Sequence, residues 1–308
     1  MLPQNNRSAL VELHFVVFIW GFTAILGKLI TLEALQLVWY RMILALLGVY
    51  AFARFTKVAL WLPRKAQWAL AGTGLIIAAH WVTFYHAIKI SNVSVTLACF
   101  SSGAFFASIF EPLLYKRKVV WYEMILGLVS IGGLYLIFSF EAQYLAGIIT
   151  AIVSASLSAL FAVMNGRFAQ KYNAAAVSVY EMAGGIAGLS LLLLADTGYA
   201  SGSYALSSSD LGYLAILAIV CTAYPFIASI RLMRKITPYT FVLSVNMEPI
   251  YGIILAWFIF GESERMTGQF YLGTAVILGT LFANAILKHY YRQKAQKIEK
   301  VGTFASQP

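Results

Sequence analysis

Glu248, in the string NMEPIYGIILAWF, lies about ten residues into an apolar stretch that runs from residue 239 to residue 260. A carboxylate in hydrocarbon costs at least about 3 kcal/mol unless it is paired, hydrated or protonated. Pro249 follows it, removes one backbone donor and leaves the carbonyl of Val245 without its helical partner. Glu248 could therefore bind an ammonium group or exchange a proton. The alternative is a structural glutamate that is protonated or bonded within its own helix.

A second polar cluster occupies the middle of another apolar stretch, in AAHWVTFYHAIK. His80 can titrate near neutral pH, and Trp81 offers one donor and a large flat face. Tyr85 follows Trp81 by one helical turn on the same face. These side chains either line a site or pack, with His80 bonded to a neighbouring helix. A metal site is not expected, because His80 and His86 do not share a helical face and no cysteine joins them.

Arg41 lies about six residues inside one end of its apolar stretch, shallow enough to extend to the interface. It could hold a carboxylate with two hydrogen bonds, clamp a gate, or bond backbone carbonyls structurally. Glu181 occupies the corresponding place in the second half of the chain. We expect Glu181 near the cytoplasmic side, where it could form an inner gate with Arg167 or Lys171.

Other polar positions in the apolar stretches favour structural explanations to different degrees. Glu111 lies one turn from a run of cations that begins at Lys116, which favours an interfacial salt bridge. Ser102 lies in a small-residue patch that either permits close helix packing or leaves room for a ligand. Tyr224 precedes Pro225 and predicts a kink next to a cavity. Asn165, at the end of its stretch, is interpreted as a helix cap.

These side chains sit on ten apolar stretches of about 20 residues, each long enough for a helix to cross a bilayer. The chain of 308 residues is 61% hydrophobic and 11% charged. The sequence therefore predicts an all-α membrane protein with ten transmembrane helices. The stretches are roughly residues 9–29, 35–54, 67–88, 94–115, 119–139, 143–164, 174–195, 211–231, 239–260 and 267–288.

The charges between the stretches alternate from one side to the other. The side with both termini holds 18 of the 22 Lys and Arg residues, the other side holds only Lys28, Lys89 and Arg265, and Arg41 lies within a span. This distribution predicts cytoplasmic termini in the cytoplasmic (inner) membrane, and residues 289–308 form a basic cytoplasmic tail. The net charge of +10 then reflects orientation and gives no indication of a nucleic-acid partner.

The two halves of the chain resemble each other weakly. Residues 35–48 align with residues 175–188 without a gap, and the pair Gly127 and Gly133 has the spacing of Gly273 and Gly279. We expect one five-helix repeat at 9–139 and another at 143–288. Five is an odd number, so the second repeat must enter the membrane from the opposite side. Two inverted repeats around a central site are typical of secondary transporters with alternating access.

Several strings together resemble the EamA family of the drug/metabolite transporter superfamily: Trp20-Gly21 in FIWGFTAILGK, Arg41 in WYRM, Glu248-Pro249, Gly261-Glu262 and Gly273. The resemblance covers about residues 10–288. It implies a ten-helix inverted-repeat fold with a cavity lined mainly by the third, fourth, eighth and ninth helices. It also implies small organic solutes, often amino acids, that are usually moved outward.

The first half contains its own Glu-Pro pair, Glu111-Pro112, but the spacing to the following helix end differs from that of Glu248-Pro249. Aligning the glycines of the next helices instead places Ser102-Gly103 opposite Glu248-Pro249. The repeats are therefore expected to differ at the midplane, with a carboxylate on one side only.

Together these features predict a secondary active transporter of small organic metabolites, and net export is the expected direction. Coupling stays open between a proton, carried by Glu248 or His80, and the solute's own gradient; the oligomeric state stays open between monomer and homodimer. No cofactor is expected, and the partners are the solute and the bilayer.

The alternative is a membrane-embedded enzyme that acts on lipid or lipid-linked substrates. The different depths of the intramembrane acids disfavour this alternative. Predicted substrate-binding residues are His80, Trp81, Tyr85, Ser102, Tyr224 and Glu248, and predicted gating or coupling residues are Arg41, Glu181 and Glu111.

Overall fold

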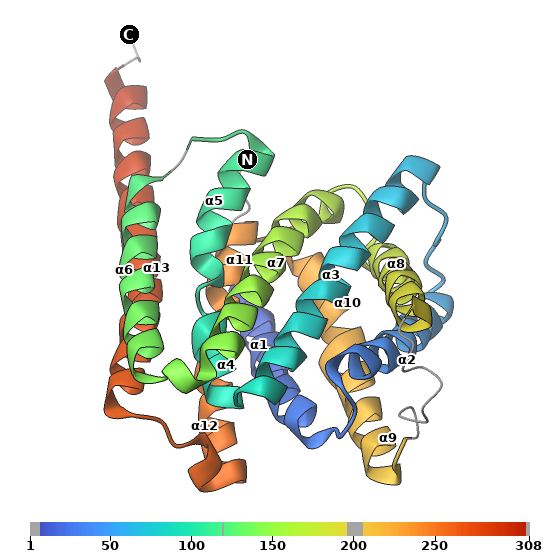
Figure 1. The fold of residues 1–308 in the computed structure, drawn as a ribbon. Helices are drawn as coiled ribbons and strands as arrows, with labels where there is room; N and C mark the ends of the chain where they lie inside the picture. The colour runs from blue at the N-terminus through green and yellow to red at the C-terminus, as the bar shows by residue number, and fades with distance from the viewer. Residues whose placement is uncertain (1–6, 119, 196–205, 306–308) are drawn as a thin grey trace.

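The computed structural model describes residues 7–118, 120–195 and 206–305, and the regular structure in these ranges is helical (Figure 1). Short 3-10 turns cover Ala142–Tyr144 and Gly261–Glu264, and a π-helical segment, η3, covers Ile216–Ala223. The α-helices are α1 (Arg7–Leu29), α2 (Ala34–Phe55), α3 (Arg64–Ile90), α4 (Val93–Phe100), α5 (Gly103–Tyr115), α6 (Trp121–Phe140), α7 (Leu145–Ala169), α8 (Ala174–Ala195), α9 (Ser208–Ala215), α10 (Tyr224–Leu232), α11 (Pro238–Val245), α12 (Glu248–Phe260) and α13 (Gly268–Ala305).

The predicted spans are confirmed as helices. Within the described residues, the first eight form helical segments long and apolar enough to cross a membrane. The ninth is divided into α11 and α12, and the tenth is the first part of α13, which continues as helix to Ala305. The chain is an all-helical membrane protein whose ten spans form two five-helix halves.

The last helix of the first half, α6, packs against the last helix of the second half, α13 (Figure 1). The Ser130 and Thr280 hydroxyls lie 2.7 Å apart. Further along α6, a Cβ placed on Gly133 would lie 2.8 Å from the Gly273 carbonyl oxygen, and one on Gly273 would lie 2.7 Å from that of Gly133. Because higher numbers on α6 meet lower numbers on α13, the helices are antiparallel. Equivalent helices thus run in opposite directions, as inverted halves require.

Each half also contains a broken span at an equivalent place. Asn92 caps α4 through a hydrogen bond from the Val95 amide, and Thr237 caps α11 through a hydrogen bond from the Thr240 amide. The second span repeats the first 145 residues later, from Val93 to Pro238 and from Gly103 to Glu248. α4 packs on α12 and α5 packs on α11, so the two broken spans pack against each other in opposite directions. The helix starts place Gly103, rather than the predicted Ser102, opposite Glu248.

The eighth span is interrupted next to Pro225, where the sequence predicts a break. Instead of continuing as α-helix, it widens into η3 and resumes as α10, with Pro225 in the first turn. Proline lacks the N–H that an α-helix would use there. Within η3 the Thr222 hydroxyl donates to the carbonyl of Leu217, five residues earlier, at 2.6 Å. This local widening places Thr222 in the protein interior.

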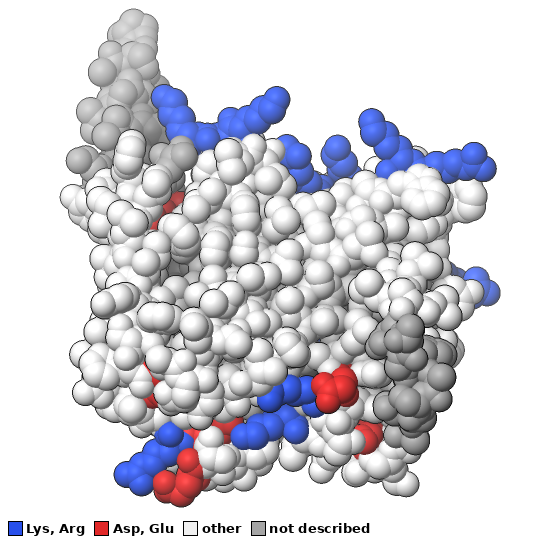
Figure 2. Space-filling view, viewed as in Figure 1, with Lys and Arg blue, Asp and Glu red and all other residues white. Residues whose placement is uncertain are grey.

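Lys and Arg gather along one edge of the bundle, whereas acids and a few cations share the opposite edge (Figure 2). We call the first edge the basic face and the second the acidic face. Their members define the two ends of the spans. The basic face includes Arg64, Lys65, Arg117, Lys118, Arg167, Lys171, Arg231, Arg234 and Lys235, and the acidic face includes Lys28, Glu33, Lys89, Glu141, Asp210, Glu262, Glu264 and Arg265.

Candidate functional site

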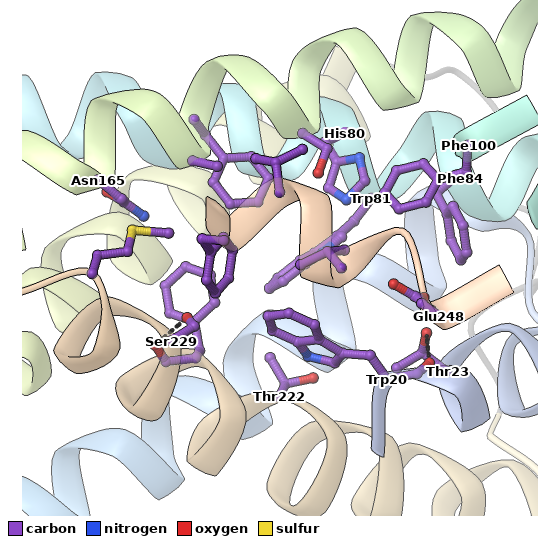
Figure 3. Close-up of a pocket in the computed structure, with 18 of the residues that line it drawn as sticks. Trp20, Thr23, His80, Trp81, Phe84, Phe100, Asn165, Thr222, Ser229 and Glu248 are labelled. Carbon is purple, nitrogen blue, oxygen red and sulfur yellow. Dashed lines mark hydrogen bonds between the residues drawn. The ribbon is translucent and has the colours of Figure 1, made fainter. Parts of the chain in front are cut away.

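A small cavity of about 70 Å³ lies inside the helical bundle (Figure 3). Helices from both halves contribute to its wall, which combines seven aromatic rings with eight polar or charged side chains. The aromatic residues are Trp20, Trp81, Phe84, Phe100, Phe161, Phe226 and Phe241, and the polar ones are Thr23, Arg41, His80, Ser158, Asn165, Thr222, Ser229 and Glu248.

Arg41 lines this cavity and is only 3% exposed, so the expectation that it could extend to the interface is wrong. Its Nε donates to the Thr222 hydroxyl at 2.8 Å, and its Nη1 donates to the Tyr85 hydroxyl at 2.8 Å. The guanidinium carbon lies 3.9 Å from the centre of the Trp81 ring, a cation–π contact. Two other helical segments, α3 and η3, therefore fix one cation deep in the protein.

Glu248 is the first residue of α12 and is 5% exposed. Its side chain points toward Thr23 at the edge of the cavity (Figure 3). The amino-terminal end of a helix carries partial positive charge, which favours a carboxylate at this position. Arg41 and Glu248 are close enough to interact electrostatically, so the cavity contains one basic and one acidic side chain.

His80 lines the cavity and also forms hydrogen bonds to a neighbouring helix. The site-lining role and the packing role that the sequence offered for His80 are therefore compatible. Its Nδ1 lies 2.8 Å from the Ser154 hydroxyl and 3.0 Å from the Ser154 carbonyl oxygen. The Ser154 hydroxyl also donates to the backbone carbonyl of His80 at 3.0 Å. The imidazole stacks on Phe100, with 5.6 Å between ring centres. α7 therefore fixes the orientation of this ring.

Three predicted binding residues lie elsewhere. Tyr85 is fully buried behind Arg41, which it orients. Ser102 is buried at the break between α4 and α5, outside the cavity wall. Tyr224 is 44% exposed and is not among the residues that line the cavity. The π-helical turn instead brings Thr222 and Phe226 to the cavity.

Among the predicted gating residues, Glu181 is buried and accepts a hydrogen bond from the Asn165 side chain at 3.4 Å, not from Arg167 or Lys171. Asn165 is not a helix cap, because α7 continues to Ala169 and the Asn165 side chain lines the cavity. Glu111 forms a salt bridge to Arg117 at 2.9 Å, which confirms the interfacial pair.

Sequence reasoning missed a set of contacts that joins the halves at the acidic face. Glu264 receives the Lys28 ammonium at 2.7 Å and the Ser94 amide and hydroxyl at 2.8 and 2.7 Å. Asp210 receives the Thr31 amide and hydroxyl at 2.8 and 2.7 Å. We call these contacts the acidic-face latch. The sequence signal for the latch was Glu264, the acid that follows the ninth span. Its partners, Lys28 and Ser94, are distant in the sequence, so no local pattern pointed to them.

The cavity extends in the other direction, toward the basic face. Asn165 lies two residues before Arg167 on α7, and Ser229 lies two residues before Arg231 on α10. The cavity thus reaches toward the ends of α7 and α10 that carry these cations.

A family model for the EamA-like transporter family matches residues 9–139 and 145–285. The chain belongs to the EamA-like transporter family. Members of this family are transporters and not enzymes, so the membrane-enzyme alternative is wrong. The two matched segments agree with the duplicated arrangement of this EamA transporter.

No curated protein matches this transporter. A solved crystal structure matches it with a TM-score of 0.69 and 15% sequence identity, covering 92% of this chain and 99% of the other. That likeness concerns the fold: the compared protein has the same overall helical arrangement.

Proposed function

We propose that this EamA transporter is a secondary carrier of small zwitterionic organic solutes, with amino acids as the leading class. It would sit in the cytoplasmic membrane with the basic face and both termini inside, and it would export its solute. One observation carries the proposal: Arg41 and Glu248 line the same buried, aromatic-walled cavity. The positive-inside distribution supports the orientation.

The chemistry of the cavity wall fits the two ends of an amino acid. Arg41 uses Nε and Nη1 for its protein bonds, so Nη2 is the nitrogen that could donate to a solute carboxylate. Glu248 supplies a negative charge for the ammonium group. The rings of Trp20 and Phe241, which pack edge to face at 6.0 Å, offer an apolar surface to the solute side chain.

The size of the cavity implies that the protein must move to bind a solute. A volume of about 70 Å³ accommodates a few water molecules, whereas small-molecule sites usually enclose roughly 300–1,000 Å³. Release of the acidic-face latch would separate the halves on that side, and closure around the basic ends would complete the cycle. Inverted halves supply the two related conformations that alternating access needs.

We assign proton coupling to Glu248 rather than to His80. Both contacts of His80 Nδ1 are to Ser154, which holds the ring as part of the α3–α7 packing. Glu248 instead lies where a solute would bind. A carboxyl group that is protonated in one conformation and ionised in the other links proton movement to solute movement.

Flux into proteoliposomes tests the solute class. Labelled phenylalanine carries both charges, phenethylamine lacks the carboxylate, and 3-phenylpropionate lacks the ammonium group. We expect phenylalanine to enter at least tenfold faster than either analogue, without ATP. Equal rates for phenylalanine and phenethylamine would reject the zwitterion assignment, and no flux for any tested amino acid would reject the solute class.

An imposed pH gradient tests coupling separately. Acid on the side opposite the solute should accelerate phenylalanine flux in the wild type, as proton–solute exchange requires. The Glu248→Gln protein should show no response to the gradient. A response that persists in Glu248→Gln would assign the proton to another group.

A further inference from the structure

A second cavity, of about 560 Å³, opens at the basic face. It lies between the beginning of α3, the end of α5 and the end of α7 with the residues that follow it. Three cations, Lys65, Arg167 and Lys171, belong to its wall, and its ten lining residues include no acid. The nearby acid Glu111 is already paired with Arg117. This cavity therefore has a positive field.

The second cavity is separate from the central one. A helix has about 3.6 residues per turn, so side chains three or four residues apart share a face. One face of α7 lines the central cavity and a different face lines the basic cavity, and no residue belongs to both. The first face carries Ser158, Phe161, Ala162 and Asn165, and the second carries Met164, Arg167 and Phe168. The basic cavity thus lies outside the expected solute path.

Its surroundings match the depth of lipid headgroups. Trp61 and Trp68, on either side of the start of α3, are 82% and 78% exposed. Exposed tryptophans at the ends of spans typically mark the interface between membrane and water. Beside the cations the wall carries apolar side chains, which include Leu114 and Phe168. Cations next to an apolar surface are the combination that a headgroup and its attached chains require.

We propose that this basic cavity binds the phosphate-bearing headgroup of an anionic phospholipid from the adjacent leaflet. Arg167 is held in place, because its Nη2 donates to the Leu114 carbonyl and its guanidinium lies 5.1 Å from the Tyr115 ring centre. Lys65 and Lys171 are exposed, and within the described residues the structure gives their ammonium groups no hydrogen-bond or ion-pair partner. They are available to neutralise a phosphate.

The test uses the purified full-length protein, freed of lipid in an uncharged detergent. Short-chain phosphatidylglycerol, short-chain phosphatidylcholine and inorganic phosphate are titrated separately, and binding is measured by native mass spectrometry and by thermal shift. The variant is Lys65→Gln/Lys171→Gln. The matched control is Lys57→Gln/Lys235→Gln, which removes two exposed lysines that do not line the cavity.

We expect phosphatidylglycerol to bind the wild type and the control equally, and the Lys65→Gln/Lys171→Gln protein about 25-fold more weakly, since each lysine near an anionic lipid surface contributes about fivefold. Lys65→Arg/Lys171→Arg should restore binding, which separates lost charge from lost folding. Equal weakening in the control, or equal binding of phosphatidylcholine, would overturn the proposal. Inorganic phosphate that binds as tightly as phosphatidylglycerol would identify a free-anion site and overturn the lipid assignment.

Discussion

The two broken helices occupy equivalent places but carry different chemistry. The first break lies between α4 and α5 and the second between α11 and α12. After the first break comes Gly103, where a Cβ would lie 3.8 Å from the Asn246 side chain, so this position faces helix packing. After the second comes Glu248, which lines the cavity. Duplication has kept the backbone break in both halves, while only the second break places an ionisable side chain in the proposed site.

The largest effect should come from removing that ionisable group. Glu248→Gln keeps the shape of the side chain, and we expect the phenylalanine flux of the proteoliposomes to fall about 10- to 100-fold, the value of one hydrogen bond to a charged group. The melting temperature should not fall, because a buried carboxylate is exchanged for a neutral group.

Glu111→Gln is the matched control, since it changes the Glu-Pro pair of the first half. Glu111 pairs with Arg117, whose side chain is 38% exposed, and it does not line the central cavity. Flux should stay within about threefold of the wild type, because partly exposed pairs contribute little. An equal loss of flux in both variants would contradict the asymmetry between the halves.

The contact between α6 and α13 provides the opposite case, in which the halves remain alike. Gly133→Ala and Gly273→Ala should each destabilise the protein by about 1–3 kcal/mol, because either Cβ would press on the carbonyl of the other residue. The effects should be similar in size and less than additive in the double variant. Thermal melting in detergent measures them.

Gly279→Ala is the control for this contact, because a Cβ there would meet no heavy atom of the described residues within 4 Å. Its melting temperature should equal that of the wild type. A large loss for Gly133→Ala with none for Gly273→Ala would show that the contact is not reciprocal.

A smaller effect should come from removing the hydroxyl group that supports Arg41, the basic residue of the cavity. Tyr85→Phe removes the hydroxyl that receives Arg41 Nη1, and flux of phenylalanine should fall about fivefold to tenfold. Phenethylamine flux should change less, since it has no carboxylate for Arg41 to bind. Tyr224→Phe, on the exposed side of the eighth span, should leave both fluxes unchanged. Equal losses for both solutes would indicate a general packing defect.

The sequence was sufficient for the spans, the two halves and the central position of Glu248 and His80, because span length and charge placement follow from the bilayer itself. It was also sufficient for the Glu111 salt bridge, whose partner is six residues away. These are features that local pattern or the membrane determines.

Prediction from the sequence failed where the position of a side chain depends on helix geometry or on partners that are distant in the sequence. The π-helical turn shifts the face of the eighth span, so Thr222 reaches Arg41 and Tyr224 points outward. Asn165 was interpreted as a cap because its helix was expected to end there. The acidic-face latch joins Glu264 to residues about 170 and 236 positions earlier, which no local pattern reveals.

The smallest effect should occur at the position equivalent to Glu248. Gly103→Ala adds a methyl group whose nearest neighbours would lie 3.8 Å away, an ordinary contact, and alanine favours helix by about 1 kcal/mol over glycine. We expect a melting temperature equal to or slightly above that of the wild type, and phenylalanine flux within twofold. If flux instead fell tenfold while the melting temperature held, α5 would have to move against Asn246 during transport. The first break would then be a working hinge, and the two broken spans would share the mechanical task even though only the second break carries an acid.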